Sequence, residues 1–222
     1  RTPAPPTGGD EMETAGREFA RLATGATIGV PYGCSPGLKG SSPDDISSQN
    51  TPLCGGRCNE GSYCDDPKAD PKMCEPGTYC SPGAVTPKPC PEGTFRNTPG
   101  GTSRASCNLT DPGFYSPLQS TGQIRCNTGS FSDSAGQGSC SPCPEGNYQD
   151  VQGSTGCKIC DPGSYCRAGA AAPLPCKGGR FANATDLAAP EQCLVCEPGW
   201  SCPISSTASV PCSPGSSAPK EE

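Results

Sequence analysis

Apolar residues are sparse along the chain, and their clearest regularity is the placement of the aromatic residues. Only 23 of the 222 residues are Leu, Ile, Val or Phe. Aromatic residues recur in the phrase Cys-x-x-Gly-x-aromatic, with a nearly constant distance from the start of one copy to the start of the next. Full copies begin at Cys58, Cys74, Cys90, Cys126, Cys143, Cys160 and Cys176, with weaker copies at Cys196 and Cys212. A fixed period of this kind predicts a tandem array from about Cys54 onward.

The phrase itself predicts a local structure. Pro-Gly in Glu75-Pro76-Gly77-Thr78 and in Asp161-Pro162-Gly163-Ser164 suits a type II turn, with Gly at the position of positive φ. The turn brings the following ring over a disulfide, so that one ring and its sulfurs form the core of a unit. Such small cores predict units with short β-hairpins, stacked end to end as an elongated rod. The rings are Tyr63, Tyr79, Phe95, Phe114, Tyr115, Phe131, Tyr148, Tyr165, Phe181 and Trp200.

Composition decides between disorder and crosslinking. Gly, Pro and Cys account for 30, 28 and 19 of the residues, and the apolar content is too low for an ordinary core. Cysteine at this density favours a small disulfide-rich fold, because each disulfide that closes a loop of roughly 15 residues contributes about 3 kcal/mol. Disulfides persist in oxidising compartments, which predicts a secreted, extracellular or cell-surface protein.

Charge and the residue inventory exclude several function classes. The net charge is −6 and the pI about 4.7, with single, scattered Lys and Arg, so nucleic acid and anionic membrane are poor partners. No apolar run reaches the roughly 20 residues of a membrane span. The chain has no His, which removes the usual catalytic triads, and no phosphate loop or nucleophile elbow is present. We therefore expect no enzyme and no cofactor. Because the chain opens at Arg1 without a leader, we expect a processed chain or a fragment.

Residues 1–53 form an N-terminal arm of different character. A Pro-rich lead is followed by a short helix predicted over about 11–23, whose apolar stripe would dock on the rod or on a neighbouring subunit. Residues 40–53 indicate a linker. Behind the arm, the cysteine spacing divides the chain into 54–107, 108–160 and 161–222, the last with a short polar tail. The docking stripe consists of Met12, Ala15, Phe19 and Leu22.

The odd number of cysteines makes Cys34 a special case. It lies in the phrase CSPGLKG, which resembles the repeat but lacks the aromatic residue. One interpretation is that Cys34 pairs within the chain and another cysteine is unpaired, or that a partner lies outside this span. The other interpretation is an intermolecular disulfide or a free thiol at Cys34.

Two stretches resemble a known family. CEPGTYCSPGAVTPKPCPEGTF (74–95) and CDPGSYCRAGAAAPLPCKGGRF (160–181) are similar to the ephrin-receptor-like cysteine-rich repeat, a relative of EGF and tumour-necrosis-receptor modules. The resemblance extends over roughly 54–217, with a displaced copy, CNLTDPGFY, between Cys107 and Cys126. It implies an extracellular protein, such as a receptor ectodomain or a surface or filament protein of protists and algae, including the mastigoneme proteins of flagellar hairs.

The resemblance also implies a disulfide pattern. In the tumour-necrosis-receptor-like arrangement, the Cys-x13-Cys and Cys-x16-Cys gaps close on themselves. Transferred to this chain, that arrangement pairs Cys90 with Cys107, Cys126 with Cys140, Cys143 with Cys157 and Cys176 with Cys193.

Metal sites are the less favoured interpretation of two clusters. The spacing Cys140-x2-Cys143-x13-Cys157-x2-Cys160 is close to that of a zinc ribbon, but each Cys-x2-Cys also fits a junction between units. Carboxylates at Asp44-Asp45, Asp65-Asp66 and Asp70 could attract calcium, but no ladder of further ligands follows them.

Two sites of modification follow from sequence motifs. Asn108-Leu109-Thr110 and Asn183-Ala184-Thr185 are acceptors for N-linked glycans in a secreted chain.

We expect a structural subunit of an extracellular glycosylated filament or surface coat, a mastigoneme-like rod whose partners are copies of itself or related repeat proteins. The alternative is a receptor or adhesin ectodomain that binds a protein or glycan. Its first candidate surface is 108–125, with Phe114, Tyr115 and Leu118.

Overall fold

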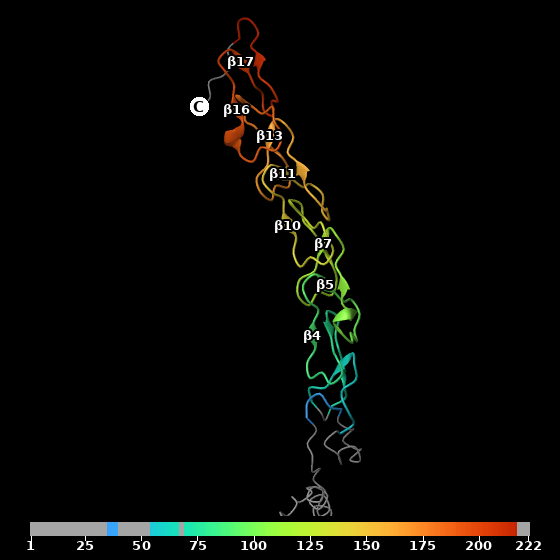
Figure 1. Cartoon of the computed structure of the whole chain (residues 1–222). Coiled ribbons are helices and arrows are strands. Elements are labelled where there is room, and N and C mark those ends of the chain that lie inside the picture. The colour runs from blue at the N-terminus through green and yellow to red at the C-terminus, as the bar shows by residue number, and fades with distance from the viewer. Residues whose placement is uncertain (1–34, 40–53, 67–68, 217–222) are drawn as a thin grey trace, which may run out of the picture.

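The computed structural model describes residues 35–39, 54–66 and 69–216. These residues form a thin, gently curved rod that runs without folding back from the N-terminal units to the C-terminal end (Figure 1). The predicted arm, with the helix over 11–23, the stripe Met12, Ala15, Phe19 and Leu22, and the residue Cys34, lies outside the described residues apart from 35–39.

Regular structure in the described chain is limited to two-residue strands and two short 3-10 helices. Each strand pairs with the next one along the chain as an antiparallel hairpin. In the N-terminal half the pairs are β1 (Ser62–Tyr63) with β2 (Lys72–Met73), β3 (Thr78–Tyr79) with β4 (Lys88–Pro89), β5 (Thr94–Phe95) with β6 (Asn108–Leu109), and β7 (Phe114–Tyr115) with β8 (Ile124–Arg125). In the C-terminal half they are β9 (Ser130–Phe131) with β10 (Ser141–Pro142), β11 (Asn147–Tyr148) with β12 (Lys158–Ile159), β13 (Ser164–Tyr165) with β14 (Leu174–Pro175), β15 (Arg180–Phe181) with β16 (Leu194–Val195), and β17 (Trp200–Ser201) with β18 (Val210–Pro211). The helices are η2 (Arg104–Ser106) and η3 (Pro190–Gln192).

Every unit starts with the turn that the phrase predicts. In the unit at Cys74 the carbonyl of Glu75 accepts the N–H of Thr78 at 3.1 Å, and Gly77 has φ +80. The turn directs the chain into the first strand. A second turn then returns it along the second strand, which ends just before the next unit. The predicted turn is confirmed here, and Gly supplies the left-handed conformation that other residues avoid.

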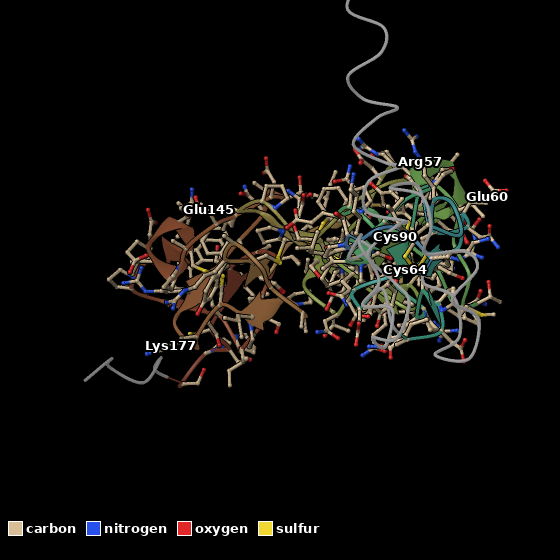
Figure 2. All side chains as sticks on the ribbon, turned by 90° about the horizontal axis from the view of Figure 1, so that it is seen from below. Arg57, Glu60, Cys64, Cys90, Glu145 and Lys177 are labelled. Carbon is tan, nitrogen blue, oxygen red and sulfur yellow. A yellow bond between two sulfur atoms is a disulfide. The ribbon has the colours of Figure 1, made fainter. Side chains whose placement is uncertain are left out.

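The core of the rod is a column of cysteines. Side chains such as Cys74, Cys90 and Cys126 are fully buried, whereas most large apolar side chains, Leu187 excepted, lie outside the core. Figure 2, which looks along the rod, shows Cys64 and Cys90 inside it and Arg57, Glu60, Glu145 and Lys177 at its periphery. Disulfides thus take the place of an apolar core.

The aromatic rings differ from the expectation. None of the ten rings is fully buried, and Trp200 is 37% exposed. Tyr165 alone of the rings packs beside a larger buried cluster, which contains Ala182 and Leu187 besides two cysteines. A hairpin with two-residue strands is too narrow to cover a ring on all sides. The rings therefore lie at the edge of the cysteine column and do not form the centre of each core.

Candidate functional site

Neighbouring units are joined by the same three backbone hydrogen bonds. Between the units at Cys160 and Cys176, the N–H of Gly163 donates to Ala182 O at 2.9 Å, the N–H of Cys166 donates to Leu187 O at 2.7 Å, and the N–H of Asp186 donates to Cys160 O at 3.1 Å. Equivalent bonds occur at each of the eight junctions in the stretch that begins with the unit at Cys58 and ends with the unit at Cys196. The rod is therefore held together by hydrogen bonds between backbone groups.

These junctions explain why the phrase requires glycine. Gly163 has φ +84, and a methyl group on it would overlap the carbonyl oxygen of Ser205 in the next unit but one. The equivalent overlap at Gly146 is with Asp186 O, and at Gly113 with Gly153 O. Glycine thus serves both the turn and the close approach of the following units.

The C-terminal end of the described rod presents the same three groups without partners among the described residues. The Cys196 carbonyl and the N–H groups of Gly199 and Cys202 form no hydrogen bond within that part of the chain. The start of a further unit is nevertheless formed, because Cys212 N donates to Gly199 O at 2.9 Å and Gly215 has φ +87. Of the described cysteines, Cys212 is the one with a free thiol, and it is half-buried.

Eight disulfides join cysteines within the described residues, in two classes. The short class pairs a unit's first cysteine with the cysteine six positions later; its members are Cys58–Cys64, Cys74–Cys80, Cys160–Cys166 and Cys196–Cys202. The long class closes the Cys-x13-Cys and Cys-x16-Cys gaps, and coincides with the pairs that the resemblance implied: Cys90–Cys107, Cys126–Cys140, Cys143–Cys157 and Cys176–Cys193. Cys54 is also disulfide-bonded.

One position separates the two classes. We call the first residue of the phrase the opening position and the third residue after its glycine the closing position. Where the closing position holds a cysteine, it pairs with the opening cysteine of the same unit. Where it does not, the opening cysteine pairs further along the chain, and the closing position holds Arg96, Ser132, Gln149 or Ala182.

Of the nine units that begin between Cys58 and Cys196, one has neither kind of disulfide. It spans 110–125, with Thr110 at the opening position and Ser116 at the closing position, and both side chains are 0% exposed. The Thr110 hydroxyl donates to Gly93 O at 2.9 Å, and the Ser116 hydroxyl donates to Gly122 O over a longer 3.4 Å. Because this unit has no cysteine at its opening position, the cysteine pattern predicts a displaced copy with three inserted residues. That prediction is wrong. The signal was TDPGFYS, which matches CDPGSYC with hydroxyls in place of thiols.

The structure separates the cysteines of the possible zinc cluster. Cys140, Cys143 and Cys157 belong to two long-class disulfides, and Cys160 belongs to a short-class disulfide. In the described part of the chain no group of three or more Cys, Asp or Glu could hold a metal ion.

One carboxylate of the possible calcium cluster, Asp65, forms an exposed ion pair, and a second exposed pair of the same kind lies further along the rod. Lys72 Nζ lies 2.7 Å from Asp65 Oδ2, and this hydrogen bond holds the pKa of the Asp65 carboxyl below its usual value and raises the pKa of Lys72. Lys158 and Asp150 form an equivalent pair at 2.6 Å, with the same directions of shift. Both lysines also lie 5.8 Å from the ring centroid of their unit's tyrosine. Because the pairs are solvated, each contributes little to stability.

The two glycan acceptors differ in their surroundings. Asn108 is exposed in β6, directly after the disulfide-bonded Cys107. Asn183 is exposed in the loop between β15 and η3, together with Ala184 and Thr185. On the candidate recognition surface, the rings of Phe114 and Tyr115 are partly buried, and Leu118 is 58% exposed.

The fold thus defines a class: a disulfide-rich array of tandem hairpin units with almost no helix in its described part. The profile of a family described as tyrosine-protein kinase ephrin type A/B receptor-like matches residues 113–160. This match covers the unit without a disulfide from Gly113 onward and the two units closed by Cys-x13-Cys gaps. No curated protein matches the chain. None of the described helices is long and apolar enough to cross a membrane. The disulfides and the family match indicate an extracellular or surface location.

Proposed function

We propose that the chain is a structural subunit of an extracellular filament or surface coat, a rod that supplies length and extends by end-to-end contact. The observation that carries this proposal is the junction itself, which repeats eight times through backbone groups and so offers the same contact to any further unit of this design. A further unit of the same design, brought by another copy of the chain, would satisfy Cys196 O, Gly199 N and Cys202 N. Heterologous contacts of this kind do not close and therefore produce fibres.

The chemistry of the rod supports this role. Its core consists mainly of disulfides, most of its charged side chains are exposed, and its two acceptor asparagines are exposed, so glycans would coat it without disturbing the fold. The role requires no catalytic group and no cofactor. A mastigoneme-like filament is the finer form of this proposal, and it is supported by the resemblance of 74–95 and 160–181.

The test uses a substitution that places a methyl group at the open end without a clash inside the chain. A methyl group on Gly199 meets nothing within 4 Å, yet in the equivalent internal junctions that space is occupied by a carbonyl of a later unit. We expect the full wild-type chain to form end-to-end rods in electron micrographs at increasing concentration, and Gly199→Ala to remain as single rods. Gly156→Ala is the control, because Gly156 also has open space around it and lies away from the end. Single rods for the wild type at every concentration would overturn the proposal.

The alternative is a receptor or adhesin ectodomain. It is supported by the family match and by exposed apolar side chains in the last units, such as Leu194, Val195, Ile204 and Val210. This role predicts saturable binding of a protein or glycan to the immobilised single rod. The binding would be lost in Ile204→Asp with Val210→Asp and unaffected by Gly199→Ala.

A further inference from the structure

The two acceptor motifs differ at the residue that carries the hydroxyl. The transferase that glycosylates asparagine requires Ser or Thr at the second residue after it. In the first motif, Thr110 is 0% exposed and its hydroxyl is engaged with Gly93 O at 2.9 Å. In the second motif, Thr185 is exposed and forms no hydrogen bond with a described residue.

The backbone around Asn108 is fixed on both sides. Cys107 is bonded to Cys90, and Asn108 itself pairs with Phe95 across β6 and β5. Thr110 N donates to Gly93 O at 3.0 Å, and Thr110 O accepts the N–H of Gly136 in the following unit at 2.9 Å. The hydroxyl therefore becomes reachable only when the β5–β6 hairpin and a unit junction have both opened.

The stretch around Asn183 is held only at its ends. Ala182 N donates to Ser206 O at 3.0 Å and Asp186 N donates to Cys160 O at 3.1 Å. The three residues of the motif between these anchors are all exposed. An enzyme can therefore contact the amide of Asn183 and the hydroxyl of Thr185 without breaking a junction.

We propose that Asn108 accepts its glycan only before the unit at Cys90 closes, whereas Asn183 accepts one in the folded chain as well. In the transfer, the Asn side-chain nitrogen forms a bond to the anomeric carbon of a lipid-pyrophosphate-linked oligosaccharide. The lipid pyrophosphate leaves and the amide loses one proton. This inference rests on the secreted location that belongs to the proposed function. Asn108 is then glycosylated only in chains in which glycan transfer preceded closure of the Cys90–Cys107 disulfide.

The test compares folded and unfolded acceptors in a cell-free assay. Full-length, disulfide-bonded chain made without glycans in a bacterial periplasm is incubated with the purified transferase and its lipid-linked oligosaccharide, beside the same chain after reduction and alkylation. Mass spectrometry then gives the occupancy of each site. We expect both sites to be modified in the reduced chain, and a fall of at least about tenfold at Asn108 alone in the folded chain, since each 1.4 kcal/mol of opening cost is tenfold.

Three results would overturn the proposal: equal rates at Asn108 in the folded and reduced chains, no modification of Asn108 in the reduced chain, or no modification of Asn183 in the folded chain. A disulfide variant sharpens the outcome. Cys90→Ala with Cys107→Ala should raise the rate at Asn108 in the folded chain, and Cys196→Ala with Cys202→Ala should leave it unchanged. Because the assay contains no cell, its result is independent of whether the chain forms filaments.

Discussion

Two units of the rod share one backbone and differ in how they are closed. The hydroxyl unit (110–125) and the disulfide unit (160–175) have the same length, the same two turns and the same hairpin register, in which Tyr115 faces Ile124 and Tyr165 faces Leu174. The first contains buried Thr110 and Ser116 where the second contains the disulfide Cys160–Cys166.

The comparison shows that the shape of a unit comes from its turn and its junctions. Gly113 N donates to Ser132 O at 2.8 Å, as Gly163 N donates to Ala182 O at 2.9 Å, although the two units are closed differently. A disulfide then adds stability to a shape that is already specified. For a loop of about seven residues the chain-entropy model gives about 2 kcal/mol.

The largest expected effect comes from breaking what the two units share. Gly163→Ala should destabilise its junction by about 3 kcal/mol or more, since the left-handed backbone costs about 1–2 kcal/mol and the methyl group overlaps Ser205 O. Gly113→Ala should cost as much in the hydroxyl unit. Hydrogen exchange of the Cys166 and Asp186 amides measures the first variant, and exchange of the Ser116 amide measures the second.

Gly199→Ala is the matched control for both. Gly199 has φ +88 but no neighbour within 4 Å, so only the backbone strain of about 1–2 kcal/mol remains. If Gly199→Ala lost as much stability as Gly163→Ala, the close approach of Gly163 to Ser205 O would contribute nothing to the effect.

The second effect converts the disulfide unit into a hydroxyl unit. Cys160→Thr with Cys166→Ser should lower the free energy of local opening by about 2 kcal/mol and leave the β13–β14 hairpin formed. Exchange of the Cys176 amide, which donates to Gly163 O at 2.9 Å, reports the loss. If protection from hydrogen exchange disappears throughout the unit, the disulfide specifies the shape of the unit, and the two units do not share a shape set by turn and junctions.

The reverse exchange should work as well. Thr110→Cys with Ser116→Cys should form a ninth disulfide in the described stretch and stabilise the hydroxyl unit by up to about 2 kcal/mol. Mass spectrometry checks it through the loss of two hydrogen atoms and a crosslinked peptide under non-reducing conditions. Two thiols that both react with an alkylating reagent in the native chain would show that the positions are not equivalent.

The hydroxyl unit is also the part of the array that the cysteine spacing did not predict. The tandem array, the turn at Gly77 and the short hairpins followed from spacing, because glycine and cysteine have few structural substitutes. The unit at Thr110 could not be found by counting cysteines, since a buried hydroxyl bonded to Gly93 O fills the same position as a sulfur. The partial exposure of the rings depends on how closely the units approach, and the backbone junctions could not be predicted because the glycine that they require is already explained by the turn.

The smallest effect concerns a contact that the hydroxyl unit has and the disulfide unit lacks. Gln123 accepts the N–H of Asp111 at 2.9 Å and donates to the Asp111 carboxylate at 2.8 Å, whereas the equivalent residues in the disulfide unit are Asp161 and Pro173. Because the contact is exposed, Gln123→Ala should cost about 0.5 kcal/mol and speed exchange of the Asp111 amide about twofold, leaving the Asp161 amide unchanged. Gln123→Glu should cost more, since it places a second carboxylate beside the first. Equal exchange rates of the Asp111 amide in the wild type and both variants would show that this contact does not compensate for the missing disulfide.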